Sequence, residues 1–150
     1  MKNVFALRGA SKKGKSQTIR TAVEMLTEIH PGATLEHNHT TKKDVQVVLT
    51  MNGWKIGIES QGSRLVDSLD LFVNVGCDVI VCATRTSGTT VNAVNALRGF
   101  DIHWLEQPEK SQPHEQILRS LIMARQINAK VDALTRSAKP APARSMSATA

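Results

Sequence analysis

Two short apolar runs with no polar interruption place the strongest constraint on how this chain can fold. They are VFAL at residues 4–7 and VIVCA at residues 79–83. A strand reads as a continuous apolar run when both of its faces are covered, as in a parallel sheet between helices. Runs of four or five residues are too short for a buried helix. The two runs therefore predict a parallel sheet with helices on both sides.

Stretches with apolar residues at helical spacing lie between and after these runs. They cover residues 15–29, 63–73, 89–98 and 114–136, and a further short strand is predicted at 102–106. The first stretch stops at Pro31 and Gly32. Strands that alternate with helices are typical of an α/β fold, so we expect a three-layer sandwich around a mostly parallel sheet.

A hairpin is predicted in the middle of the chain. Apolar residues alternate over residues 45–51 and again over 54–58, and Asn52-Gly53 separates the two runs. An Asn-Gly pair between alternating runs is a strong short-range hairpin signal. We therefore expect a five-stranded sheet in which the hairpin contributes one antiparallel strand, at an edge.

Length and composition indicate one domain. The chain has 150 residues, 41% of them hydrophobic and 21% charged, which suffices for one core. We assign residues 1–137 to one folded domain and the Ala-, Pro- and Ser-rich residues 138–150 to a flexible tail. The net charge of +6 favours anionic partners.

The sequence also predicts a cytoplasmic location. It has no signal-peptide pattern and no apolar window of membrane-spanning length. Cys77 and Cys82 are five positions apart, around a predicted strand. Because side chains alternate along a strand, we expect the two cysteines on opposite faces of the sheet. We interpret them as reduced packing residues.

A glycine- and lysine-rich segment follows the first predicted strand. Gly9, four further residues, and then Gly14, Lys15 and Ser16 fit the pattern GxxxxGK[ST], between a predicted strand and a predicted helix. In this context, glycines let successive backbone amides point inward, and the helix start adds positive potential, which suits a phosphate. The candidate phosphate-binding residues are Gly9, Ala10, Ser11, Lys12, Lys13, Gly14, Lys15, Ser16 and Gln17.

On these residues the chain resembles the P-loop NTPase superfamily, which implies that residues 1–137 form a P-loop nucleotide-binding domain. The resemblance implies that Lys15 reaches the terminal phosphates and that the Ser16 hydroxyl holds Mg²⁺. It also implies a nucleoside triphosphate as the ligand, with ATP the first choice on abundance and GTP not excluded. The alternative interpretation is a glycine-containing surface loop whose lysines are merely exposed.

P-loop proteins place a carboxylate at the end of a neighbouring strand to organise the metal. Glu59 in WKIGIESQG is the first candidate for this metal and catalytic role, and Glu106 is the second. ESQG also resembles the acid-x-x-Gly signature of Ras-like GTPases, which implies that Gly62 senses the terminal phosphate and that Thr40 or Thr41 contacts Mg²⁺. Glu replaces the expected Asp, and no Asn-Lys-x-Asp follows the fourth strand, so guanine selectivity is unsupported. Glu59 as a solvated strand-end charge is the alternative.

Further candidates lie near the strand ends. Arg85 follows the predicted strand at its carboxyl end, where ligands of open α/β sheets bind, and it would pair with phosphate or an acidic substrate. Arg64 is a similar, weaker candidate. An exposed arginine in a helix-capping loop is the alternative for both. His37 and His39 in EHNHTT fit two surface histidines better than the HNH nuclease motif.

Three functions follow from these interpretations. The first is a small Mg²⁺-dependent ATPase in which Lys15 and Glu59 carry catalysis and which acts through a protein partner or as a homo-oligomer, with the long final helix as a contact surface. The second is a small phosphotransferase, or kinase, although no insertion large enough for a lid is evident. The third is a nucleic-acid-associated basic module, which the scarcity of aromatic residues disfavours.

Overall fold

The computed structural model describes residues 2–9, 12–42, 44–107 and 113–140. It has a six-stranded sheet with the order β2-β3-β4-β5-β1-β6. The strands are β1 (Lys2–Arg8), β2 (Thr34–Asn38), β3 (Gln46–Met51), β4 (Trp54–Glu59), β5 (Val79–Thr84) and β6 (Phe100–Glu106). The helices are α1 (Lys12–Ile29), the short 3-10 helix η1 (Gly62–Arg64), α2 (Leu65–Asn74), α3 (Thr89–Asn95) and α4 (Pro113–Thr135).

The sheet confirms the α/β class and corrects the strand count. Strands β4, β5, β1 and β6 pair in parallel, β3 runs antiparallel to β4, and β2 runs antiparallel to β3. The prediction of five strands was wrong because β2, with the sequence TLEHN, is exposed over most of its length and carries no apolar alternation. The antiparallel strand β3 is consequently second from the edge, and β2 covers it.

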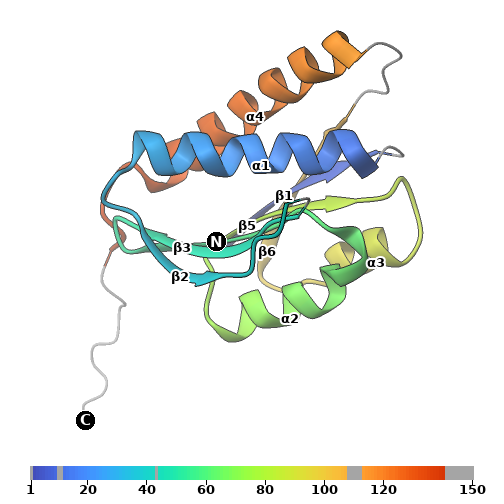
Figure 1. The fold of residues 1–150 in the computed structure, drawn as a ribbon. Coiled ribbons are helices and arrows are strands. Elements are labelled where there is room, and N and C mark those ends of the chain that lie inside the picture. Colours follow the sequence, from blue (N-terminus) through green and yellow to red (C-terminus); the bar gives the residue numbers. More distant parts are fainter. Residues whose placement is uncertain (1, 10–11, 43, 108–112, 141–150) are drawn as a thin grey trace.

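Helices cover both faces of the sheet (Figure 1). Side chains from α1 and α4 pack with one face of the sheet in one buried cluster, and side chains from α2 and α3 pack with the other face in a second cluster. The predicted hairpin between β3 and β4 is confirmed, with Asn52 at φ 52° and Gly53 at φ 81° in the turn. Both positive φ angles match the turn type that Asn-Gly favours.

The packing of α2 on the sheet is close. A Cβ atom added to Gly57 in β4 would lie 2.5 Å from Cγ of Phe72, a fully buried residue of α2. Only a residue without a side chain lets the ring approach the strand this closely. The α2 side of β4 is therefore fixed by tight apolar contact.

Helices α1 and α4 run in the same direction. Ser120 Oγ donates to the Gly14 carbonyl at 3.4 Å, and Asn128 Nδ2 donates to the Ala22 carbonyl at 3.2 Å. Both contacts join residues that are 106 positions apart, so the chain direction is the same in the two helices and their register is constant between these contacts. At this offset the start of α1 is level with Leu118, and the first residues of α4 extend beyond it.

The chain after α4 is held against the hairpin. Asn52 Nδ2 donates to the Thr135 carbonyl at 2.8 Å, and Trp54 Nε1 donates to the Ser137 carbonyl at 2.7 Å. Lys139, which lies within the predicted flexible tail, donates from Nζ to Asp78 Oδ1 at 2.8 Å. The start of that tail is thus docked, and residues 141–150 lie outside the described residues.

Both cysteines are free and buried, as predicted. They nevertheless belong to the same buried cluster on the α2 and α3 side, because Cys77 precedes β5 and does not follow its alternation. Burial raises the pKa of each thiol to about 12. Within the part of the chain that the structure describes, no helix is long and apolar enough to span a bilayer.

Candidate functional site

The motif segment connects β1 to α1. Gly9 leaves β1 and donates from its amide to the Thr84 carbonyl at 3.3 Å. A Cβ atom at Gly9 would lie 3.1 Å from the Gln107 carbonyl oxygen, so a glycine suits this close approach of two backbones. Helix α1 already begins at Lys12, which places Gly14 inside the helix and makes the connection shorter than the sequence predicts. Ala10 and Ser11 lie outside the described residues.

Lys15 is buried in the second turn of α1, with only 4% of its surface exposed. Its Nζ donates a hydrogen bond back to the Gly9 carbonyl. Burial lowers the pKa of this ammonium group, and the positive charge of Arg85 lowers it further. The Lys15 ammonium therefore lies in a buried position that disfavours its positive charge, next to the second cation, Arg85.

A cavity of about 480 Å³ lies beside Lys15. Its walls come from the segments after β4 and β5, at the carboxyl ends of parallel strands, together with α1 and the first turns of α2 and α3. The described residues that line it include two cations and several hydroxyls but no carboxylate. They are Lys15, Ser60, Gly62, Ser63, Val66, Ala83, Thr84, Arg85, Ser87, Gly88, Thr89 and Thr90.

The loop between β5 and α3 forms the outer wall of this cavity. Thr90 Oγ1 accepts a hydrogen bond from the Arg85 amide at 2.9 Å, so the start of α3 fixes the backbone of Arg85. Gly88 precedes α3 at φ 95°, a conformation that favours glycine. The predicted position of Arg85 at a strand end is confirmed, and its guanidinium and Lys15 lie close enough for their charges to interact.

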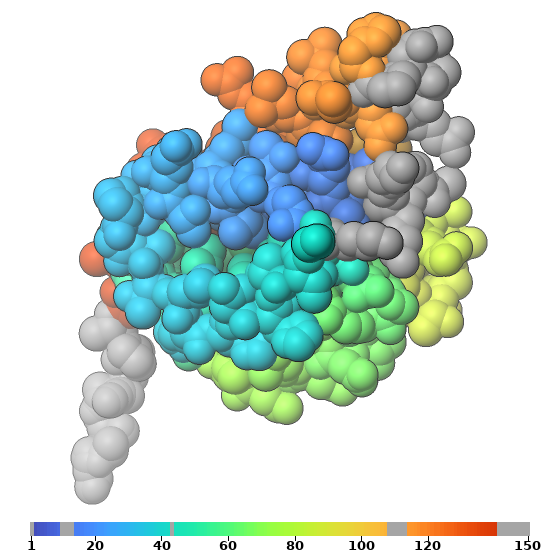
Figure 2. Space-filling view, viewed as in Figure 1, coloured from blue at the N-terminus to red at the C-terminus, as the bar shows by residue number. Residues whose placement is uncertain are grey.

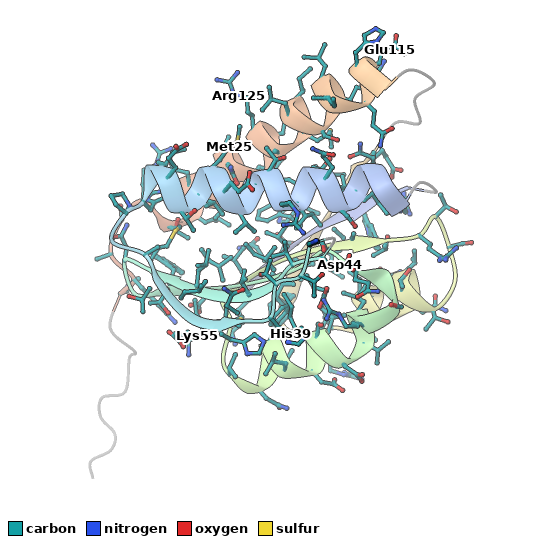
Figure 3. All side chains as sticks on the ribbon, in the orientation of Figure 1. Met25, His39, Asp44, Lys55, Glu115 and Arg125 are labelled. Carbon is teal, nitrogen blue, oxygen red and sulfur yellow. The ribbon has the colours of Figure 1, made fainter. Side chains whose placement is uncertain are left out.

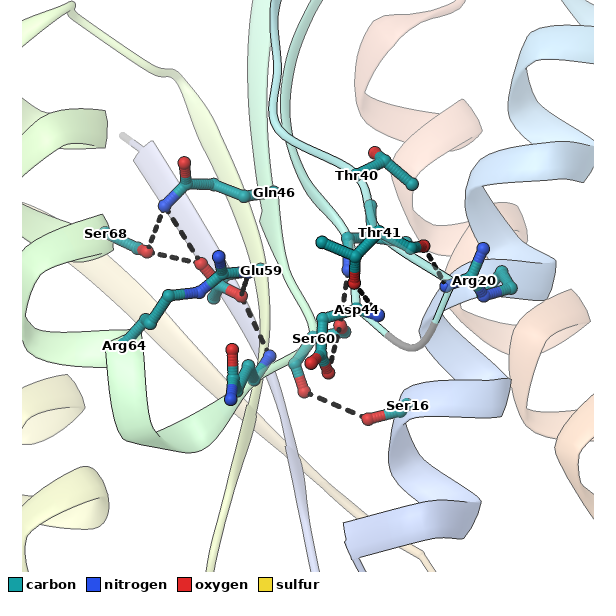
Figure 4. A network of polar contacts seen from close by, with 12 residues as sticks. Ser16, Arg20, Thr40, Thr41, Asp44, Gln46, Glu59, Ser60, Arg64 and Ser68 are labelled. Carbon is teal, nitrogen blue, oxygen red and sulfur yellow. Dashed lines mark hydrogen bonds and ion pairs between the residues drawn. The ribbon is translucent and has the colours of Figure 1, made fainter.

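Glu59 ends β4 and is fully buried. Its Oε1 accepts from Gln46 Nε2 at 3.1 Å and from the Ser68 hydroxyl, and its Oε2 accepts from the Gln61 amide at 2.9 Å and from Arg64 Nη2 at 3.2 Å (Figure 4). Each carboxylate oxygen thus has two donors. In this conformation Glu59 fixes the turn that carries Gly62 to the cavity wall.

Ser16 contacts the end of the same strand from the α1 side. Its hydroxyl lies 3.5 Å from the Ser60 carbonyl oxygen, a long contact. The Ser60 hydroxyl oxygen accepts a hydrogen bond from the Val45 amide at 2.7 Å, and the hydroxyl donates to Asp44 Oδ1 at 3.5 Å. Figure 4 draws the contacts of Ser60 with Asp44 and with Ser16 as dashed lines. Two contacts therefore link Ser16 to a carboxylate.

Sequence reasoning missed Asp44 and Ser60. Asp44 is an isolated acid ahead of β3, and its carboxylate meets Ser60 only after the β3–β4 pairing forms. Ser60 directly follows Glu59, and alternation along the strand would have placed it on the α1 side. That alternation is the one signal that could have found it.

The remaining candidates lie apart from the cavity. Gln17 is exposed on α1, and Glu106 pairs with Arg8 at 2.6 Å. The Thr41 carbonyl accepts from Arg20 Nη2 at 2.8 Å, and the Thr40 hydroxyl donates to Asn38 at 2.5 Å, the latter a local contact within the loop.

The two histidines ahead of β3 also stay away from the cavity. His37 Nε2 contacts Gln46 Oε1 at 2.8 Å, and His39 is exposed. Across the residues that the structure describes, no three His, Cys, Asp or Glu side chains gather as a metal site would require. The surface-histidine interpretation is the one that this geometry favours.

Comparison with known proteins adds no relative. The chain matches no protein-family model, no curated protein and no solved structure. The resemblance to P-loop NTPases therefore depends on the motif and on the geometry around Lys15, and it stays a prediction.

Proposed function

We propose that this protein binds a nucleoside triphosphate with Mg²⁺ and acts as a small ATPase together with a partner. The observation that carries the proposal is the meeting of Lys15 and Arg85 at a cavity without a described carboxylate. Two cations that converge without a counter-charge favour a multiply charged anion. The cavity also lies at the carboxyl ends of parallel strands and beside the start of α1, which suit phosphate groups.

The residues present fit a magnesium ion near Ser16. Mg²⁺ is held by few protein oxygens and by phosphate, and it would neutralise the charge that develops on the phosphates. The Ser16 hydroxyl is the first ligand that we assign. Glu59 is the predicted carboxylate, but its oxygens already accept four hydrogen bonds, whereas Asp44 shares Ser60 with Ser16. We therefore add Asp44 as a second candidate carboxylate.

A phosphotransferase is the second candidate function. The outer wall of the cavity presents the hydroxyls of Ser87 and Thr89 and the guanidinium of Arg85, which suit a hydroxyl or acidic acceptor. Phosphate release without an added acceptor would support the ATPase. Turnover that requires an added nucleoside or similar hydroxyl compound would support the phosphotransferase.

The experiment is a calorimetric titration of ATP, GTP and a nonhydrolysable ATP analogue, each with Mg²⁺, followed by a phosphate-release assay. We expect Lys15→Met to weaken triphosphate binding about 100-fold, since one charge-assisted contact to phosphate is lost in a buried place. Lys130→Met, at an exposed lysine of α4, is the matched control and should bind as the wild type does. Equal affinity of Lys15→Met and the wild type would refute the site.

The metal assignment needs its own comparison. We expect Ser16→Ala to raise the Mg²⁺ concentration that half-saturates triphosphate binding. Asp44→Asn and Glu59→Gln then separate the two carboxylates, because only the variant that removes the metal-linked acid should shift this concentration. A shift with neither variant would remove both carboxylates from the metal site.

A further inference from the structure

The first turns of α4 carry an exposed apolar patch. Ile117, Leu118, Leu121 and Ile122 are 60%, 57%, 38% and 47% exposed, respectively. By the offset of 106 residues between the two helices, they lie around the level at which α1 starts. This end of α4 rises away from α1 at the top of the molecule (Figures 1 and 2). Neighbouring large apolar side chains at this exposure mark a contact surface more often than an isolated exposed residue does.

Part of this patch belongs to a stripe with charged ends. Glu115, Leu118, Ile122 and Arg125 are spaced by three, four and three residues, so they share one face of the helix. Glu115 precedes the apolar pair and Arg125 follows it, and Figure 3 shows both labelled side chains along the outer part of α4. We call these four residues the α4 stripe.

The α4 stripe is complementary to itself in an antiparallel arrangement. If a two-fold axis passes at the level of Ser120, Leu118 faces the partner's Ile122 and Ile122 faces the partner's Leu118. The same axis places Glu115 opposite the partner's Arg125, and the converse pair forms at the other end. One axis therefore satisfies the apolar and the charged positions together, which is the requirement for an isologous contact.

We propose that the α4 stripe pairs two copies of this protein through antiparallel α4 helices. The apolar centre supplies the attraction, and the two Glu115–Arg125 pairs set the direction of the helices. A patch of two to three helical turns suits a reversible dimer, with a dissociation constant of about 10 µM to 1 mM. This proposal does not depend on nucleotide binding.

The first test measures self-association by sedimentation velocity over a range of about 5 µM to 1 mM protein. We expect the wild type to form a dimer and Leu118→Asp to weaken it at least about tenfold, because a buried aspartate replaces an apolar contact. Val73→Asp on α2 is the matched control, since Val73 is 44% exposed, and it should leave the dimer unchanged. A wild type that stays monomeric throughout would overturn the proposal.

The second test uses the charges to check the direction of the helices. Glu115→Lys alone and Arg125→Glu alone should each weaken self-association, because each places like charges opposite each other at both ends. An equimolar mixture of these two single variants should associate again, since both end pairs are then of opposite sign. The double variant in one chain should also recover. Failure of both to recover, with folded proteins, would exclude the antiparallel pairing.

Discussion

Lys15 and Glu59 are two buried charges near the ends of parallel strands, and their surroundings differ. The carboxylate of Glu59 receives hydrogen bonds on both oxygens from a strand, a turn and two neighbouring helices. Among the residues that the structure describes, the ammonium of Lys15 donates to a single acceptor, the Gly9 carbonyl, and it faces a second cation at a cavity. A charge that its own fold satisfies supports structure, whereas a charge that lacks compensation is suited to a ligand.

The largest expected effect is a loss of stability from changing the packing of α2 on β4, the strand that ends at Glu59. Gly57→Ala would bring a methyl group against the Phe72 ring, so we expect a loss of about 3 kcal/mol in the free energy of unfolding. Chemical denaturation measures this loss. Gly32→Ala is the control, because a Cβ atom there meets nothing within 4 Å. An unchanged midpoint for Gly57→Ala would show that α2 shifts freely on β4.

The next effect concerns the carboxylate itself. Glu59→Gln keeps the size of the side chain but removes the charge that Arg64 pairs with and turns one acceptor into a donor, so we expect a loss of about 2 kcal/mol. Ser68→Ala removes one donor and keeps the carboxylate, and it should cost about 1 kcal/mol. Glu59→Gln as stable as the wild type would contradict the structural role described here. Its turnover is to be compared at equal folded fraction.

The third expected effect is a dependence of triphosphate affinity on pH that comes from the Lys15 ammonium. The triphosphate that we propose needs the protonated ammonium, so we expect its affinity to be full below the pKa of Lys15 in the free protein and to fall as pH rises through that pKa, by up to about tenfold per pH unit. Because burial and Arg85 lower this pKa, the fall should begin below the ordinary lysine range. The chain has no tyrosine to titrate in the same region. Titration of triphosphate at increasing pH measures the fall, and Lys15→Met should lack it.

The smallest expected effect is the change in the free energy of unfolding caused by Lys15→Met. Because the pKa of Lys15 is lower in the folded protein than in the unfolded chain, its charge destabilises the fold at every pH below the folded-state pKa. This penalty is relieved as pH rises from the folded-state pKa to the pKa of the unfolded chain. Lys15→Met removes the penalty and one hydrogen bond, so we expect its free energy of unfolding at neutral pH to stay within about 0.5 kcal/mol of the wild type. A loss as large as that of Glu59→Gln would erase the difference between the two charges.

Local patterns predicted most of the fold, and long-range contacts account for what they missed. The apolar runs located β1 and β5, and Asn52-Gly53 located the hairpin, because each signal lies within a few residues. Strand β2 was missed since it is held by pairing with β3 and not by an apolar pattern of its own. At the site, Lys15 was predicted from the glycine-lysine motif and Arg85 from its place after a strand, whereas Gln46 in β3 and Ser68 in α2, which donate to Glu59, carry no local signal.

The buried thiols of Cys77 and Cys82 have a practical consequence. An alkylating reagent attacks the thiolate, and a pKa of about 12 together with burial keeps both sulfurs unreactive while the chain is folded. The rate of alkylation therefore reports how often the buried cluster between the sheet and helices α2 and α3 opens to solvent. The chain thus carries its own reporter of rare opening events, which needs no attached dye and works in every variant that keeps both cysteines.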